Sequence, residues 1–269
     1  MFHALAIAAV VFYFAASWSL VSSIRRGEGA LQLQPRGYLV AGLAAHLAFL
    51  VLFVGQEIIV TGQWSRPTTI TAVSAFVVGI FLFVSGRGRE IGLAALVVPV
   101  GMTLLVISAF VFHSQRQVEP LPGMTALISL HLAAGVVGTG LLLLNAICAM
   151  ALLIKERAIR THSLTVFARA LPSLVRLEQV SGQAQDIGFT AMVLAVLFGI
   201  GAAVQTGVQN FALDPRSLWS LVVLSFYGVL LYKRKRSALR GRKAALMALA
   251  AFCVIILSYL LMTSSFHVY

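Results

Sequence analysis

Residues 124–153 read MTALISLHLAAGVVGTGLLLLNAICAMALL and contain no Asp, Glu, Lys or Arg. A helix needs about 20 apolar residues to cross the hydrocarbon core of a bilayer, so this stretch is long enough to span a membrane. Backbone groups in lipid must be satisfied within helices or closed barrels, and the sequence lacks the ten-residue alternation typical of a barrel. The stretch therefore predicts an all-α integral membrane protein.

The rest of the chain has the same character. Of its 269 residues, 60% are hydrophobic and 10% are charged, and the mean hydropathy is +0.96. A soluble domain carries about 25% charged residues, so this composition excludes a water-soluble enzyme. We predict a single eight-helix membrane domain whose spans lie at about 2–22, 38–60, 69–85, 91–112, 124–153, 184–207, 217–232 and 243–264.

The positive charge is distributed unevenly. The net charge is +12, and the loops after the first, third, fifth and seventh spans hold 17 of the 20 Lys and Arg residues. By the positive-inside rule these loops are cytoplasmic, and the N-terminus and C-terminus both lie outside. Nucleic acid is not expected as a partner, because no basic face with base-reading groups is visible. Anionic lipid is expected at the cytoplasmic loops, especially near residues 233–243.

Histidines at membrane depth are the main candidates for a functional site, because ionisable groups in lipid are costly. His46 is expected about 12 Å from the cytoplasmic start of the second span, and His131 about 10 Å from the external start of the fifth. His267 and His113 are expected on the same external side as His131. Each also allows a simpler interpretation, as a packing or solvated histidine, and His46 also allows a role in proton relay.

Small residues follow His131 along the fifth span: Ala133, Ala134, Gly135, Gly138 and Gly140. They permit close helix packing or the close approach of a flat ligand. Two histidines on opposite faces of a haem make a six-coordinate iron site. Zinc sites usually add a carboxylate or thiolate, and the sequence contains neither HExxH nor CxxC. Among the metal sites considered, the histidines favour haem.

The expected external loop between the sixth and seventh spans is rich in apolar and aromatic residues. Residues 205–219 read QTGVQNFALDPRSLW. Phe211 and Trp219 are either anchors at the membrane–water interface or parts of a hydrophobic platform for a planar ligand. The expected cytoplasmic loop 154–183 contains an amphipathic connector that Pro172 would break into two pieces.

The segment DPRSLWSL at residues 214–221 resembles the end of the tryptophan-rich WWD segment of the cytochrome c assembly family. This family includes the CcsA, CcmC and HemX-like membrane proteins. LRGRKAA at 239–245 and SFHVY at 265–269 resemble the family's GWRGRRAA and LHSY segments. The resemblance extends upstream to His46, to Leu130-His131, to Lys155-Glu156-Arg157 and to the connector at 171–178, so it covers most of residues 38–269.

The resemblance implies a haem-handling protein of cytochrome c biogenesis in the inner (plasma) membrane of a bacterium. It would present haem at the outer face for attachment to apocytochrome c, together with a second cytochrome c assembly membrane protein. Carried over by position, His131 and His267 are the axial ligands of a non-covalent b-type haem, and His46 is a membrane-embedded ligand on the uptake path. No catalytic residue is assigned, because the bond-forming groups belong to haem and apocytochrome.

The same resemblance implies that Phe211, Asp214 and Trp219 line the haem platform. Arg116 or Arg216 on the external side is suited to pair a haem propionate, because arginine matches carboxylate geometry. The sequence departs from the family at Phe211 and Leu213, which replace tryptophans, and at Ser217, which replaces a glutamate.

The departures favour, as an alternative, a HemX-like non-catalytic scaffold or regulator. It would bind a partner through the basic cytoplasmic loops 154–183 and 233–243, and its histidines would be packing residues. A small-solute transporter is a third interpretation. The lack of paired buried charges and of an inverted repeat counts against a transporter.

Overall fold

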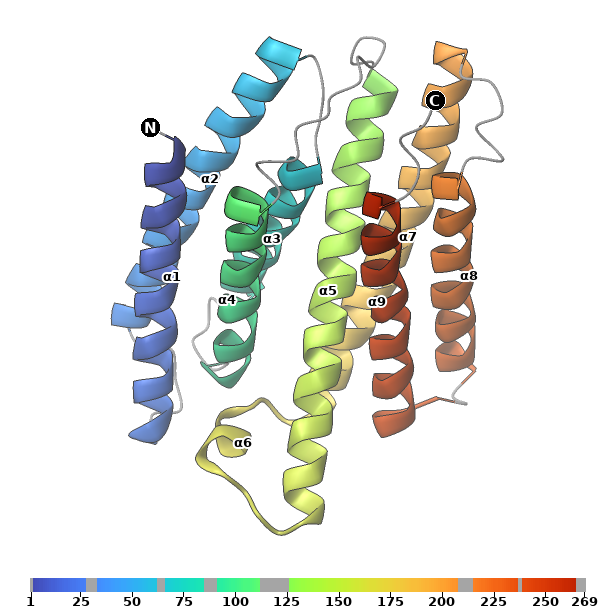
Figure 1. Ribbon diagram of the computed structural model, residues 1–269. Coiled ribbons are helices and arrows are strands. Elements are labelled where there is room, and N and C mark those ends of the chain that lie inside the picture. Colours follow the sequence, from blue (N-terminus) through green and yellow to red (C-terminus); the bar gives the residue numbers. More distant parts are fainter. Residues whose placement is uncertain are drawn as a thin grey trace. The chain divides into compact units, whose positions relative to one another are not determined.

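A computed structural model of the 269-residue chain describes residues 2–27, 33–61, 66–84, 91–111, 126–207, 215–236 and 239–264. The regular structure in these ranges is entirely helical, as predicted (Figure 1). In chain order the elements are α1 (Phe2–Arg25), α2 (Leu33–Thr61), α3 (Arg66–Val84), α4 (Ile91–Val106), η1 (Ile107–Val111), α5 (Ala126–Arg160), α6 (Val166–Ala170), α7 (Leu174–Thr206), α8 (Pro215–Lys235) and α9 (Gly241–Ser264).

Each of the eight predicted apolar spans lies on a helix. Six helical segments are long and apolar enough to cross a membrane: His3–Arg25, Gln34–Gly55, Ile91–Phe110, Ala126–Arg160, Leu174–Thr206 and Gly241–Ser258. The span predicted at 69–85 falls on a shorter apolar helix, Thr68–Phe83, and the one at 217–232 falls on α8. The chain is a multi-pass membrane protein, while the full count of eight spans and the external position of both termini stay predictions.

Several helices continue beyond the apolar runs that predicted them. α7 begins at Leu174, before the predicted start of the span at residue 184. α5 continues to Arg160, beyond the predicted end of the span at residue 153. Hydropathy registers only the apolar part of a helix, whereas the backbone ladder continues through polar residues in water. The predicted break at Pro172 is confirmed, because α6 ends at Ala170 and α7 begins only at Leu174.

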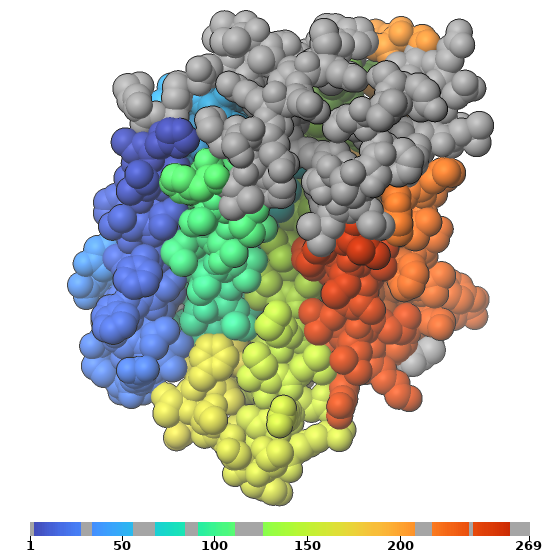
Figure 2. Space-filling view, in the orientation of Figure 1, coloured from blue at the N-terminus to red at the C-terminus, as the bar shows by residue number. Residues whose placement is uncertain are grey.

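The helices form two compact units, which we describe separately. Unit 1 comprises Met1–Met124 and Arg157–Ser173, and unit 2 comprises Thr125–Glu156 and Leu174–Tyr269. In unit 1, α1 packs against α2 and α4, and α3 packs against the same two helices. The space-filling view shows α1, α4 and α6 next to one another on one face of this unit (Figure 2).

The short helix α6 packs against the beginning of α4. A Cβ atom at Gly92 would lie 2.6 Å from the carbonyl oxygen of Ala170, so only glycine allows this contact. The Thr165 side chain caps α6 by accepting a hydrogen bond from the Ala168 N–H at 3.2 Å. At the end of α5, His162 adopts a φ of 48°, and the Ser163 N–H donates to the Ala158 carbonyl at 3.0 Å. This is a Schellman-type helix end, with a left-handed residue after the last turn.

Unit 2 contains α7, α8, α9 and most of α5. Glycines allow α5 and α7 to approach closely: a Cβ at Gly138 would lie 2.7 Å from Met192, and one at Gly188 would lie 3.1 Å from Leu141. Small residues at helix contacts are characteristic of membrane proteins, where packing drives helix association. On the outside, large apolar side chains are exposed, such as Val204 at 68%. In a membrane protein these side chains face lipid.

Candidate functional site

His131 on α5 has a fixed orientation and a fixed tautomer. Its Nδ1 lies 2.7 Å from the carbonyl oxygen of Ala195 on α7. A carbonyl can only accept, so Nδ1 carries the proton and donates it. In the neutral ring, Nε2 therefore keeps its lone pair. An imidazole held through one nitrogen by a carbonyl is the usual arrangement of a metal-ligating histidine.

Two glycines shape the surroundings of His131. Gly199 lies one helical turn after Ala195, and a Cβ there would be 2.9 Å from Nδ1 of His131. The absence of a side chain at Gly199 thus leaves room for the imidazole against α7. Gly135 lies one turn after His131 on α5, and a Cβ there would meet no atom within 4 Å. The half-buried imidazole is therefore packed tightly against α7 on its Nδ1 side.

Of the other residues predicted for the site, Trp219 is the one that the structure describes in unit 2. Gly201, near the end of α7, contacts Leu127, near the start of α5. α8 follows α7 in the chain, and Trp219 on α8 is half-buried. Phe211, Asp214, His267, His113 and Arg116 lie outside the described residues, and the side chain of Arg216 is likewise not described.

His46 on α2 is fully buried in unit 1. Its Nδ1 lies 3.2 Å from the hydroxyl of Tyr13 on α1, and the two rings meet edge to face. Gly42, one turn before His46, makes this possible, because a Cβ there would lie 2.7 Å from the Tyr13 ring. Nε2 of His46 has no partner that meets full hydrogen-bond geometry in the described part of the chain, but the Thr71 backbone lies close enough to the imidazole for a weaker hydrogen bond.

The hydroxyl partner leaves the tautomer of His46 open. If the Tyr13 hydroxyl donates to Nδ1, then Nε2 carries the proton. If Nδ1 carries the proton and donates to Tyr13, then Nε2 has a free lone pair. Only the second tautomer is able to ligate a metal. Nothing in the sequence pointed to Tyr13, since the residue lies in the middle of an ordinary apolar span.

Further hydroxyl groups are buried in unit 1. Thr71 and Ser108 share a hydrogen bond of 2.6 Å between their side-chain oxygens, and Ser74 donates to the Gly101 carbonyl at 2.9 Å. Ser108 belongs to η1, a π-helix, and such turns are frequent at functional sites. The interior of this unit is therefore more polar than its hydropathy suggests.

A second polar cluster was not predicted, and it lies in unit 2 where α7 begins and α8 ends. We define the Arg234 cluster as Asn145, Ser181, Gln185, Arg234 and Glu178. Arg234 donates to the Gln185 side-chain oxygen at 3.0 Å and to the Glu178 carbonyl at 2.7 Å, and Ser181 donates to Asn145 at 2.7 Å. In the sequence, Arg234 is one of the basic residues at 233–243 that indicate a cytoplasmic loop and anionic lipid. The informative pattern was Ser181 and Gln185, two polar residues one turn apart on a membrane helix.

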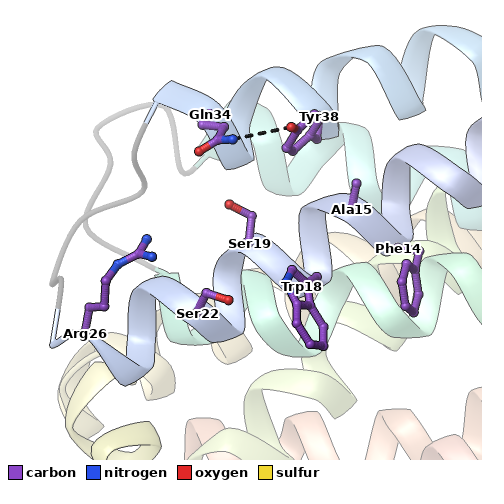
Figure 3. A pocket seen from close by; sticks show the side chains of 8 residues that line it. All are labelled: Phe14, Ala15, Trp18, Ser19, Ser22, Arg26, Gln34 and Tyr38. Carbon is purple, nitrogen blue, oxygen red and sulfur yellow. Dashed lines mark hydrogen bonds between the residues drawn. The ribbon is translucent and has the colours of Figure 1, made fainter.

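An open groove of about 560 Å³ runs between α1 and α2 in unit 1 (Figure 3). Trp18, Tyr38 and Arg26 line it, and Gln34 donates to the Tyr38 hydroxyl at 3.4 Å. Trp18 is 70% exposed. Aromatic rings beside an arginine at a helix end are typical of the membrane–water boundary, so the groove marks that boundary on α1.

The described residues contain no group of three or more His, Cys, Asp and Glu side chains that could hold a metal ion. Any metal at these residues must therefore rely on few protein ligands. A haem needs only one or two axial side chains, and the Nε2 lone pair of a neutral His131 fits that requirement. The fold and this histidine together define a multi-pass helical membrane protein that carries a preoriented imidazole.

Comparison with known proteins identifies the family. Residues 40–268 match the cytochrome C assembly protein family, and the chain belongs to it. The family resemblance in the sequence is thereby confirmed, and it makes cytochrome c biogenesis the broad functional assignment. Tyr13 and the groove between α1 and α2 precede the matched region.

Three relatives illustrate the range of similarity. A 28.8 kDa protein of Azospirillum brasilense is 29% identical over 83% of this chain and 81% of its own length. Protein HemX of Brevibacillus brevis is 25% identical over 62% of each chain. The cytochrome c biogenesis protein CcsA of Synechocystis is 24% identical over 39% of this chain and 31% of its own length. The matches thus span less than two thirds of HemX and about a third of CcsA, and no solved structure matches the chain.

Proposed function

We propose that this protein binds haem and presents it at the outer face of the bacterial inner membrane for attachment to apocytochrome c. The observation that carries the proposal is the hydrogen bond from His131 Nδ1 to the Ala195 carbonyl. In the neutral ring it leaves the Nε2 lone pair free and held in one direction, as an iron ligand requires. Membership of the cytochrome C assembly protein family supports the same proposal independently.

In this proposal His131 and His267 are the axial ligands of a non-covalent b-type haem. Phe211, Asp214 and Trp219 line the platform beneath the ring, and Arg116 or Arg216 pairs a propionate. Bound haem supplies the vinyl groups that form thioether bonds with the cysteine thiols of apocytochrome c. The protein's own residues bind and orient the haem and hold its iron, and a second cytochrome c assembly membrane protein is the expected partner.

His46 is the proposed ligand on the path by which haem enters. His46 lies within residues 40–268, which match the family, and this supports the role. Ligation requires the tautomer in which Nδ1 donates to the Tyr13 hydroxyl. It also requires space at a side chain that is fully buried, so α1 or α3 must move when haem binds there.

The test is the visible absorption spectrum of detergent-purified protein, oxidised and after reduction with dithionite. We expect a Soret peak and sharp reduced α and β bands, and His131→Ala and His267→Ala should each abolish the copurified haem. The matched control is His162→Asn, because His162 is exposed and asparagine tolerates its positive φ. Unchanged haem absorbance in the two alanine variants would exclude the ligand assignment.

The second candidate function is a scaffold that holds a partner at its cytoplasmic loops. The connector around α6 favours it, because Leu164 and Val166 are exposed there next to basic residues of the same loop. This scaffold would need no haem. A featureless spectrum that persists after haem is added, together with capture of a partner that is lost on Leu164→Ser, would favour the scaffold over haem presentation.

A further inference from the structure

The Arg234 cluster contains two buried amide groups that are incompletely hydrogen-bonded. Asn145 on α5 and Gln185 on α7 are both fully buried. The amide nitrogens of both side chains have no partner in the described part of the chain. An unsatisfied buried polar group costs about 1–3 kcal/mol, so two of them in one cluster require an explanation.

The unpartnered nitrogen of Gln185 does not result from an ambiguous amide orientation. A guanidinium group can only donate, so the Gln185 oxygen must face Arg234 and its nitrogen must face elsewhere. The amide of Asn145 is less constrained, because the Ser181 hydroxyl is able to donate or to accept. In either orientation of Asn145, one end of its amide remains without a partner.

A pocket of about 320 Å³ lies beside the partners of these amides, although Asn145 and Gln185 themselves do not line it. Ser181 and Arg234, the hydrogen-bonding partners of the two amides, both line it. Arg240 and Glu178 also line it. The remaining lining is largely apolar and includes Ala149, Leu152, Val175, Leu239, Ala244 and Ala245.

The local structure holds Arg234 and Glu178 in place. Gly182 lies beneath the guanidinium, since a Cβ there would be 3.0 Å from its Nη2 atom. Burial lowers the pKa of Arg234 and the carboxylates of Asp186 and Glu178 raise it, but a guanidinium stays protonated under all ordinary conditions. Glu178 accepts a hydrogen bond from the Gly241 N–H at 2.6 Å and so caps α9. Its carboxylate is thereby partly neutralised, whereas Arg234 keeps N–H donors beyond the two that are bonded.

We infer that this pocket binds an anionic phospholipid, with the phosphate at the Arg234 guanidinium and the acyl chains against the apolar lining. The pocket lies where α7 and α9 begin and α8 ends, so it joins a polar edge to an apolar interior. Lys233, Lys235 and Arg236 adjoin it in the sequence, and basic segments of this kind attract anionic lipid. A zwitterionic headgroup would place a second cation among these arginines, which disfavours it.

The test uses delipidated full-length protein in detergent, with thermal unfolding and native mass spectrometry as readouts. We expect phosphatidylglycerol, but not phosphatidylcholine, to raise the unfolding temperature and to stay bound. Gln185→Glu keeps an acceptor for Arg234 but places a negative charge against the guanidinium that would hold the phosphate. It should retain its unfolding temperature without lipid and bind phosphatidylglycerol at least about tenfold more weakly.

Arg236→Gln is the matched control, because it also lowers the net charge by one, at a residue close to Arg234 in the sequence that does not line the pocket. It should bind phosphatidylglycerol as the unchanged protein does. Equal stabilisation by both lipids, or equal weakening by Gln185→Glu and Arg236→Gln, would overturn the inference. Displacement of the lipid by millimolar inorganic phosphate would also overturn it, since the ligand would then be a soluble anion. None of these outcomes depends on haem binding.

Discussion

His131 and His46 are both histidines in apolar helices, yet their surroundings give them different chemical properties. His131 is half-buried and donates to a backbone carbonyl, which fixes its tautomer. His46 is fully buried and shares a hydrogen bond with a hydroxyl, which leaves its tautomer undetermined. The partner of Nδ1 therefore decides whether Nε2 is available as a ligand. The depths expected for His131 and His46 in the membrane do not by themselves distinguish their chemical properties.

The largest expected effect is on the packing around His46. His46→Ala should lower the free energy of unfolding by about 2–4 kcal/mol, because it leaves a cavity and removes the partner of the Tyr13 hydroxyl. His131→Ala should cost less, since that side chain is half-buried. Thermal unfolding of both variants in detergent measures the difference, and equal losses would remove the contrast between the sites.

The next effect concerns the positioning of His131. Gly199→Ala places a Cβ 2.9 Å from Nδ1 of the imidazole and should displace the ring. We expect a stability loss of about 1–3 kcal/mol and a clear fall in copurified haem. Gly228→Ala is the control in the same unit, because its Cβ would make only an ordinary contact, 3.7 Å from Phe189. Equal haem content in the two variants would show that Gly199 does not position the ligand.

A smaller effect is expected from removing the Tyr13 hydroxyl in unit 1. Tyr13→Phe removes the partner of His46 Nδ1 and keeps the ring that packs on Gly42. The unfolding free energy should fall by about 1–2 kcal/mol, because the imidazole nitrogen stays buried without a partner. The absorbance that depends on His131 should not change. A loss of that absorbance would contradict the separate treatment of the two histidines.

The smallest effect is expected on the contact between Thr139 and Met192. Their hydroxyl and sulfur lie 3.9 Å apart, which is a weak hydrogen bond. Thr139→Val keeps the shape and should change the unfolding free energy by less than about 0.5 kcal/mol. The same thermal measurement sets the baseline against which the histidine variants are compared. A loss above about 1 kcal/mol would mean that the sulfur contact contributes more than its length suggests.

Much of the fold was predictable from hydrophobic runs alone. Each apolar run coincides with a helix, because in lipid only a helix satisfies the backbone hydrogen bonds of a segment that is not part of a closed barrel. The ends of α5 and α7 were not predictable in this way, since water-exposed turns carry no hydropathy signal. The short helix α6 was anticipated only as a fragment before Pro172.

The site was predictable in its residue types and not in its contacts. His131 and His46 stood out because imidazoles are rare at membrane depth. Their partners did not, because a backbone carbonyl such as that of Ala195 and a tyrosine in an apolar span look ordinary in a sequence. Gly199 likewise carries meaning only once the neighbouring helix is placed.

The packing of α6 on Gly92 has a consequence for biosynthesis. Unit 1 is completed by Arg157–Ser173, which the ribosome produces only after all of Thr125–Glu156. Translation proceeds from the N-terminus, so α1 to α4 emerge before the segment that covers the start of α4 exists. A ribosome that stalls before codon 157 would leave unit 1 without α6, and the start of α4 would stay accessible to membrane chaperones and proteases until synthesis resumes.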